Sequence, residues 1–222
     1  MKSRKAICDV MISWLGAEQG SAMHQHILSI YNTQKNLPRG YKMRINDAWC
    51  AATVSAAALS VGYEDIIPCE CSCTKMIEKL KALDSWIEND AFVPSPGDLI
   101  FYDWEDDGKG DCIGQPNHVG VVISVEDNRI NVIEGNKGTP GRVAYRNISV
   151  GSRYIRGFGV PMYDDDHIIP EAKPAELYYE VQPGDYLIKI GKRFDCDWMD
   201  IARLNNLHFP YIIHKGERLR IK

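Results

Sequence analysis

The hydrophobic positions in the N-terminal part of the chain recur with the spacing of amphipathic helices. Apolar residues three or four apart mark one face in the segments 7–15, 24–31 and 76–83. The alanine-rich run 50–59 is apolar on every side, as in a helix that is buried all round, and Gly62 ends it. This part of the chain is therefore predicted to form helices in all four segments.

From residue 96 the pattern changes to short apolar runs of β-branched and aromatic residues, divided by Gly, Asp and Asn turns. The predicted strands lie at residues 98–104, 118–125, 129–134, 143–148 and 154–160. Helices followed by strands indicate an α+β fold, in which helices pack on one antiparallel sheet.

The C-terminal part of the chain has a different pattern. Residues 164–176 combine prolines and charges without periodicity, which is typical of a linker. Residues 177–222 then read as a strand, two short helices and a last strand, a small βααβ unit. We therefore expect a large domain at residues 1–163 and a small one at 177–222.

Composition and charge narrow the function classes. The net charge of −4 provides no basic face for nucleic acid, so we expect no nucleic-acid partner. Seven loosely spaced cysteines argue against a disulfide framework and for a reducing cytoplasm. Asp9 interrupts the only candidate signal core, and no run approaches the roughly eighteen apolar residues of a membrane helix. We expect a monomer made in the cytoplasm without a signal peptide and without a transmembrane segment.

The residues that best fit a catalytic site are a cysteine, a histidine and a glutamate. Cys50 opens the alanine-rich helix, where free N–H groups and the positive end of the helix dipole favour a thiolate. A buried cysteine without a catalytic role is the alternative. His118 begins one predicted strand and Glu134 ends the next, so a hairpin would bring them together. Nucleophilic catalysis needs such a thiol, a base and a group that orients the base.

Two other groups of polar residues fit a metal or redox role less well. His24 and His26 lie two residues apart on a predicted helix and therefore point in different directions. Cys69, Cys71 and Cys73 have one-residue gaps and no second cluster, unlike a zinc site. We interpret the cysteine cluster as a loop of reduced thiols, with a redox or metal role as the alternative.

An acidic segment between the first two strands imitates the first half of a calcium loop. Its carboxylates are Asp103, Glu105, Asp107 and Asp111, but Gly114 stands at the twelfth position, where a bidentate glutamate would be expected. The sequence favours a solvated acidic loop, with calcium binding as the alternative. We expect the chain to require no cofactor.

Four motifs in this order resemble those of a CHAP domain. They lie at residues 48–51, 96–102, 117–122 and 133–136. CHAP domains are papain-like cysteine amidohydrolases that cut peptidoglycan, and the resemblance covers roughly residues 1–163. It implies that Cys50 is the nucleophile, His118 the base, and Glu134 and Asn136 the polar partners of the histidine.

The small C-terminal unit resembles a LysM module through residues 179–187, 204–207 and 213–221. This family binds N-acetylglucosamine-containing glycans in a groove between the loop after the first strand and the loop before the last. The resemblance implies that one side of the groove faces the segment from Asn206 to Ile213. The residues on that side are Gly184, Asp185, Tyr186 and Leu187. The alternative is that these residues only hold a small fold together.

Together the two resemblances imply a cell-wall lytic enzyme, a phage-type endolysin or a host autolysin. Such an enzyme cleaves either the bond between N-acetylmuramic acid and L-alanine or a bond within the stem peptide or cross-bridge. An endolysin would act on the wall after a separate hole-forming protein, a holin, releases it. The first alternative is a catalytically inactive peptidoglycan-binding wall protein, against which the retention of Cys50, His118 and Glu134 counts. An intracellular cysteine amidase is the second, and the LysM-like segment argues against it.

Overall fold

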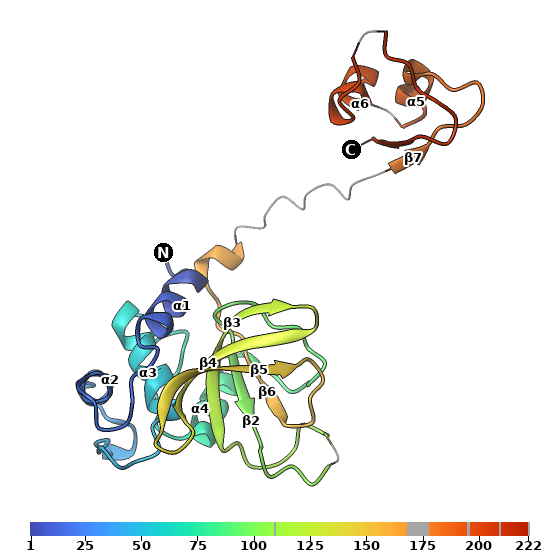
Figure 1. Ribbon diagram of the computed structural model, residues 1–222. Coiled ribbons are helices and arrows are strands. Elements are labelled where there is room, and N and C mark those ends of the chain that lie inside the picture. Colours follow the sequence, from blue (N-terminus) through green and yellow to red (C-terminus); the bar gives the residue numbers. More distant parts are fainter. Residues whose placement is uncertain (109, 168–177, 195, 209, 222) are drawn as a thin grey trace. The chain divides into compact units, whose positions relative to one another are not determined.

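A computed structural model describes residues 1–108, 110–167, 178–194, 196–208 and 210–221 (Figure 1). The chain divides into two compact units, Met1–His167 and Ile168–Lys222. Most of the expected linker, residues 168–176, lies outside the described residues. Over the part of the chain that is described, no helix has the length and apolar character needed to cross a membrane.

The first unit begins with the helices that the hydrophobic period predicts. They are α1 (Arg4–Ser13), α2 (Ala22–Asn32), α3 (Cys50–Val61) and α4 (Cys73–Ala82), with a short 3-10 helix η1 (Pro38–Gly40) between α2 and α3. Serine side chains cap three of them: Ser3, Ser21 and Ser72 each accept a hydrogen bond from a backbone N–H of the first turn. These caps explain why α1, α2 and α4 begin where they do.

The helices are followed by one antiparallel sheet in the order β1-β6-β2-β3-β4-β5. Its strands are β1 (Trp86–Ile87), β2 (Leu99–Tyr102), β3 (His118–Glu126), β4 (Arg129–Lys137), β5 (Arg142–Ser149) and β6 (Ile155–Gly159). The α+β prediction is confirmed, and all five predicted strands are present. The sequence missed β1, which has two residues and exists through its pairing with β6.

The middle of the sheet is buried on both faces, because β2 is buried at all four positions and successive side chains of a strand point to opposite faces. Leu99 and Phe101 belong to the core shared with the helices, whereas Ile100 and Tyr102 belong to a second cluster on the opposite face. Helices α1 to α4 lie on one side of the sheet (Figure 1). The functional site described below lies where α3 meets this sheet.

Helix α3 is buried from Cys50 to Ala58, and its small side chains allow a close approach to the sheet. At Gly135 of β4, an added Cβ would come within 2.1 Å of the Thr53 hydroxyl oxygen. The glycine is therefore required by packing. This contact fixes the first turn of α3 against the strand that carries Glu134.

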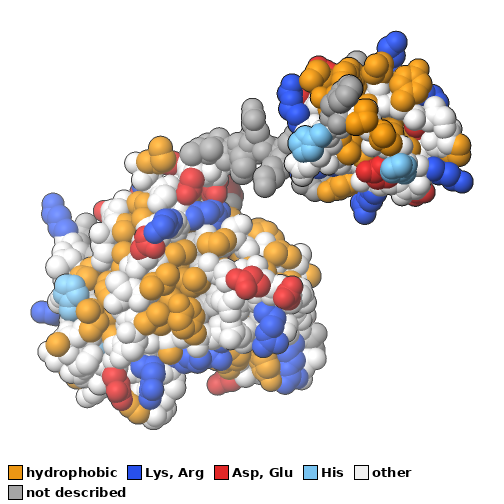
Figure 2. Space-filling model, turned by 45° about the horizontal axis from the view of Figure 1, so that its top comes forward, with side chains coloured by type: hydrophobic (Ala, Val, Ile, Leu, Met, Phe, Trp, Pro, Cys, Tyr) orange, Lys and Arg blue, Asp and Glu red, His pale blue; other side chains and the backbone are white. Residues whose placement is uncertain are grey.

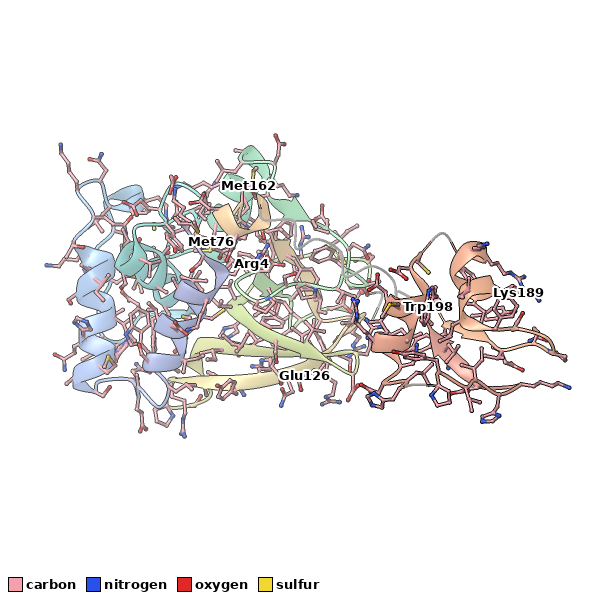
Figure 3. All side chains as sticks on the ribbon, turned by 90° about the horizontal axis from the view of Figure 1, so that it is seen from above. Arg4, Met76, Glu126, Met162, Lys189 and Trp198 are labelled. Carbon is pink, nitrogen blue, oxygen red and sulfur yellow. The ribbon has the colours of Figure 1, made fainter. Side chains whose placement is uncertain are left out.

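Arg4 of α1 joins three segments that are far apart in the sequence (labelled in Figure 3). Its guanidinium lies 2.7 Å from Asp98, in the turn before β2, and 2.6 Å from Asp166. Asp166 belongs to the 3-10 helix η2 (Asp164–His167). Asp164, Asp165 and Asp166, which the sequence places in the linker, are thus bonded to residues of the first unit.

The second unit has the predicted βααβ order, with β7 (Tyr178–Glu180), α5 (Leu187–Arg193), α6 (Trp198–Leu204) and β8 (Arg218–Arg220). Strands β7 and β8 pair antiparallel. The buried residues of its small core are Val181, Leu187, Ile190, Ile201, Ala202, Leu219 and Ile221. Figure 2 shows apolar side chains gathered on the visible face of this unit. Its large exposed apolar residues are Tyr178, Tyr186, Ile188, Met199, Leu204 and Ile212.

Candidate active site

Cys50 is the first residue of α3, and Trp49 occupies the N-cap position. The side chain is buried, with 5% exposure. Hydrogen bonds to its sulfur from Cys73, His118 and the Ala51 backbone outweigh the cost of burial and hold the pKa of Cys50 well below its usual value. Cys50 is therefore poised as a thiolate, as its position at a helix start predicts.

His118 opens β3 and lies between Cys50 and Glu134. Its Nε2 is 3.1 Å from Oε2 of Glu134, which leaves Nδ1 as the ring nitrogen available to the sulfur. Burial disfavours the charged ring, but hydrogen bonds with Cys50 and Glu134 outweigh it and raise the pKa of His118 to about 9. The downward shift at Cys50 and the upward shift at His118 both favour a thiolate beside an imidazolium.

Glu134 in β4 is completely buried and has two cationic partners. Its Oε2 faces His118, and its Oε1 lies 2.5 Å from Nε of Arg146 in β5. Burial alone would raise the pKa of Glu134. The hydrogen bonds and positive charges of His118 and Arg146 outweigh burial, so the pKa of Glu134 is lower than its usual value. The carboxylate thus stays ionised beside the imidazolium.

Arg146 is a site residue that the sequence analysis missed. Ala144 lies opposite Glu134 in the β4–β5 ladder, so Arg146, two residues on, occupies the diagonal position on the same face. Its guanidinium carbon lies 4.3 Å from the centre of the Trp104 ring. Its place beside Glu134 follows from the register of β4 and β5, which the hydrophobic pattern of the sequence does not give.

Aromatic rings form the wall behind the histidine. Tyr102 lies opposite His118 in the β2–β3 ladder, with 5.9 Å between the ring centres. The Tyr102 ring stacks on Trp104 at 4.6 Å and an interplanar angle of 16°. Burial and the neighbouring Glu134 raise the pKa of Tyr102 well above its usual value, so the phenol stays neutral. This wall limits the movement of the imidazole and of Arg146.

A family model described as "CHAP domain" matches residues 39–136, and one described as "LysM domain" matches residues 179–222. The chain carries a CHAP domain followed by a LysM domain. Both resemblances inferred from the sequence motifs are thereby confirmed. The CHAP match begins before α3 and ends at Asn136, so it includes Cys50, His118 and Glu134.

Two solved structures are similar to parts of the chain. "The crystal structure of Ly7917" has 13% identity and a TM-score of 0.40, and the match covers 81% of this chain and 66% of that one. "Crystal structure of MoCVNH3 variant (Mo0v) in complex with (N-GlcNAc)4" has 27% identity and a TM-score of 0.20, with 44% of this chain and 57% of that one covered. The chain thus spans less than two thirds of either structure. A comparison with curated proteins gives no match.

Asn136 of the CHAP domain lies at the irregularity of β4 that follows Glu134, in the left-handed region with φ 56°. Its side chain packs against Gly141, where an added Cβ would come within 2.2 Å of the Asn136 Oδ1. The side-chain hydrogen bonds of His118 are with Glu134 and Cys50. The expected role of Asn136 as a second polar partner of the histidine stays a prediction.

Cys73 enters the site in a way that the sequence analysis did not foresee. The interpretation of residues 69 to 73 as a loop is wrong at its end, because Cys73 is the first residue of α4 and Ser72 caps that helix. The Cys73 sulfur lies 4.0 Å from the Cys50 sulfur. Ser72 was the available signal, since serine is a preferred N-cap residue.

The two N-terminal histidines lie apart from this chemistry. His24 is buried against Trp49, with 4.3 Å between ring centres, and its Nδ1 accepts a hydrogen bond from the Gly20 backbone at 2.9 Å. His26 is exposed on the same helix. The two side chains diverge, as their spacing predicts, and His24 supports the residue that precedes the nucleophile.

Two of the four carboxylates named for the acidic loop accept backbone hydrogen bonds within the loop. Asp103 accepts a hydrogen bond from the Glu105 backbone at 3.0 Å, and Asp111 accepts one from Ile113 at 3.0 Å. An added Cβ at Gly114 would come within 2.0 Å of the Asp103 carboxylate. Among the described residues, no group of three or more His, Cys, Asp or Glu side chains could hold a metal ion. Calcium binding stays an untested alternative.

The expected groove residues of the LysM domain differ in their surroundings. Leu187 is buried in the small core, whereas Tyr186 is 57% exposed. Asp185 accepts hydrogen bonds from the Tyr179 hydroxyl at 2.7 Å and the Gln182 backbone at 2.9 Å, and these bonds lower the pKa of Asp185 to about 2. Leu187 and Asp185 therefore support the fold, and Tyr186 is free to contact a ligand.

The remaining expected groove residues are Gly184, Asn206 and Ile213. Gly184 has φ 81° and forms the turn before α5. Asn206 lines a hollow of about 380 Å³ with Met199, Ala202, Arg203, Leu207, His208 and Tyr211. Ile213 is half-buried against the core. Of these three residues, Asn206 has the surroundings of a binding residue.

Proposed function

We propose that this chain hydrolyses an amide bond of bacterial peptidoglycan with Cys50 as the nucleophile. The observation that carries the proposal is the buried Cys50–His118–Glu134 arrangement at the start of α3, within a CHAP domain. The lowered pKa of Cys50 and the raised pKa of His118 favour the thiolate and imidazolium that acyl transfer uses. The adjacent LysM domain supports a cell-wall polymer as the substrate.

In the proposed reaction, the Cys50 thiolate attacks the amide carbonyl and forms a tetrahedral intermediate. The first N–H groups of a helix lack intrahelical partners, so the Cys50 backbone N–H is available to the oxyanion. The His118 imidazolium gives its proton to the leaving amine, which leaves a thioester on Cys50. His118, now neutral, takes a proton from water as the water attacks the thioester. The Cys50 thiolate then leaves, the product acid releases its proton to solvent, and the starting thiolate–imidazolium pair is restored.

Glu134 keeps the imidazole in place through both steps. Its hydrogen bond to Nε2 directs Nδ1 toward the sulfur and stabilises the positive charge of the ring. Arg146 holds the second carboxylate oxygen, so the acid cannot rotate away from the histidine. The substrate therefore meets a base whose orientation is set before binding.

We infer that the LysM domain binds N-acetylglucosamine-containing glycan and keeps the CHAP domain at the wall. A tethered enzyme acts at a raised effective concentration of substrate. The exposed ring of Tyr186 and the hollow beside Asn206 are the features that support this role.

The scissile bond is either the N-acetylmuramoyl-L-alanine amide or an amide within the stem peptide or cross-bridge. The experiment is digestion of purified sacculi by the wild type and by Cys50→Ala, followed by mass spectrometry of the fragments. New L-alanine amino termini indicate an amidase, and new amino termini within the peptide indicate an endopeptidase. Fragments without a new amine, or equal release by Cys50→Ala, would contradict the proposal.

We also propose that the enzyme is an endolysin, for which a cytoplasmic expression experiment is the test. Cells that produce the wild type should stay intact until a pore-forming protein opens the membrane, and should then lyse. Cys50→Ala should not lyse them. A wild type that sediments with sacculi but releases no fragments would instead favour the inactive wall-binding protein.

A further inference from the structure

The site contains a second sulfur that the proposed mechanism does not use. Cys73 lies 4.0 Å from Cys50, sulfur to sulfur, and the two side chains are 7% and 5% exposed. Each cysteine is the first residue of a helix, α4 and α3 respectively. The two thiols are therefore held together by two rigid elements.

We propose that Cys50 and Cys73 form a redox pair, which a peroxide converts to a disulfide that reversibly stops hydrolysis. The disulfide would remove the nucleophile from the reaction without damaging it. The loss of hydrolysis rests on the proposed function of Cys50, whereas formation of the disulfide does not.

The two sulfurs differ in reactivity in the way this reaction needs. Cys50 is the thiolate, and its neighbour is a thiol: the hydrogen bond to Cys50 and burial raise the pKa of Cys73 well above its usual value. Burial raises the pKa of Cys8 to about 11 and that of Cys69 to about 12. Because the thiolate is the nucleophile, Cys50 should react with a peroxide before these three cysteines.

The oxidation is balanced in two steps. The Cys50 thiolate attacks one peroxide oxygen and becomes a sulfenic acid, and the other oxygen leaves as hydroxide. The Cys73 sulfur then attacks the Cys50 sulfur, and its proton accompanies the departing hydroxyl group as water. Overall, two thiols lose two electrons, one hydrogen peroxide is reduced, and two waters form.

The sulfur–sulfur distance sets the movement that the second step needs. A disulfide has sulfurs about 2.05 Å apart, so the two sulfurs must approach by about 2 Å. Side-chain rotation of both cysteines supplies movement on this scale.

Cys71 provides a matched control in the same segment. It is half-buried, two residues before Cys73, and its sulfur accepts a hydrogen bond from Arg39 Nη2 at 2.9 Å. That contact holds Cys71 next to an arginine rather than next to Cys50. A disulfide between Cys50 and Cys73 should therefore form with or without Cys71.

The test is to treat the full chain with one equivalent of hydrogen peroxide, block free thiols with iodoacetamide, and map the peptides without reduction. We expect a cross-linked pair that contains Cys50 and Cys73, and an intact mass lower by two hydrogen atoms before blocking. Wall hydrolysis should fall at least tenfold and return on addition of dithiothreitol.

Two variants distinguish a Cys50–Cys73 disulfide from unspecific oxidation of the chain. The activity of each oxidised variant is compared with the activity of the same variant after full reduction. In Cys73→Ser the sulfenic acid has no partner thiol. With at least two equivalents of peroxide, a second peroxide should therefore oxidise it to the sulfinic acid, and dithiothreitol should not restore activity, whereas the wild type treated in the same way should recover. Cys71→Ser should behave like the wild type in both the cross-link and the recovery.

Three results would overturn the proposal. The first is a wild type in which Cys50 is linked to Cys71 or is oxidised without a cross-link. The second is full recovery of hydrolysis by oxidised Cys73→Ser on addition of dithiothreitol. The third is unchanged hydrolysis by the cross-linked protein. Peptide mapping needs no substrate and decides the matter even if Cys73→Ser fails to fold. A fully reduced wild type that does not hydrolyse peptidoglycan would contradict the proposed function, and this result is independent of whether the disulfide forms.

Discussion

Arg146 holds the acid that orients the histidine: its Nε lies 2.5 Å from Oε1 of Glu134, and Glu134 is completely buried. The same guanidinium rests on Trp104. Arg146 therefore contacts Trp104 on one side and Glu134 on the other, and Glu134 in turn contacts His118. Catalysis should therefore depend on a residue that does not reach the substrate amide.

Arg146→Met should lower turnover while keeping Cys50 in place. Without the guanidinium, Glu134 loses one of its two partners and can rotate away from His118. We expect about a tenfold loss, which corresponds to about 1.4 kcal/mol of transition-state stabilisation. The measurement is kcat/KM on soluble wall fragments. Arg146→Lys is the control: it keeps the charge but loses the planar contact with Trp104, so its loss should be smaller. Equal activity of all three proteins would show that Arg146 has only a surface role.

The same substitution should also destabilise the domain. Removing one partner of a buried ion pair costs about 3–5 kcal/mol, but the Arg146 side chain is 26% exposed, so we expect a smaller value of about 1–3 kcal/mol. Denaturant unfolding of Arg146→Met and the wild type measures this difference. An unchanged free energy of unfolding would mean that water already compensates the Glu134 charge.

Glu134→Gln should preserve the fold but lower turnover by on the order of a hundredfold. Replacing the acid of a serine triad by its amide costs about ten-thousandfold, and we expect less here because a cysteine is more acidic than a serine. Loss of the carboxylate should also lower the pKa of His118. The pH profile of Cys50 alkylation by iodoacetamide reports this change. If turnover and the profile both stay as in the wild type, Asn136 becomes the candidate orienting residue.

The activity of the wild type should fall as the pH rises through about 9, where His118 loses its proton. The pKa of His118 is raised from 6.5, so the imidazolium contributes stability in full below pH 6.5, and this contribution is lost as the pH approaches about 9. Cys50→Ser removes the thiolate and should shift the His118 titration, followed by NMR of the ring, to lower pH. A titration unmoved by Cys50→Ser would contradict the ion pair.

The elements of the fold were predictable because each carries its own hydrophobic period. The segments that form α1 to α4 and β2 to β6 bury one face or both. The spacing of apolar residues within each segment therefore predicts its type. Strand β1 was not predictable in this way, because its two residues, Trp86 and Ile87, are a strand only through their pairing with β6.

The residues of the candidate site likewise divide into those that the sequence predicts and those that only the tertiary structure brings into the site. Cys50, His118 and Glu134 could be proposed from a helix start and two strand ends. Arg146 and Cys73 could not, since each reaches the site through tertiary structure: Arg146 through the register of β4 and β5, and Cys73 through the meeting of two helix starts. A linear pattern encodes neither relationship.

Calcium should leave the thermal unfolding of the chain unchanged, because Asp103 and Asp111 already accept backbone hydrogen bonds within the acidic loop. A ligand that binds only the folded state raises the unfolding temperature. The measurement is calorimetry with millimolar calcium and with a chelator. A higher unfolding temperature in calcium that Asp107→Asn abolishes would show that the loop binds the ion.

Tyr186→Ala should weaken binding to sacculi without unfolding the LysM domain, because Tyr186 is 57% exposed while the neighbouring Leu187 is 4% exposed. An exposed aromatic ring offers a flat apolar face to a sugar, and its removal costs the core nothing. Leu187→Ala is the matched comparison: it should destabilise this small core by about 2–5 kcal/mol and weaken binding through loss of the fold. Co-sedimentation with sacculi measures binding, and circular dichroism of the isolated residues 168–222 measures folding. In the full chain, Tyr186→Ala should keep its activity on soluble wall fragments, since the CHAP domain is unchanged. If Tyr186→Ala binds sacculi as the wild type does, the ring lies outside the glycan site, and the hollow beside Asn206 becomes the binding surface to test.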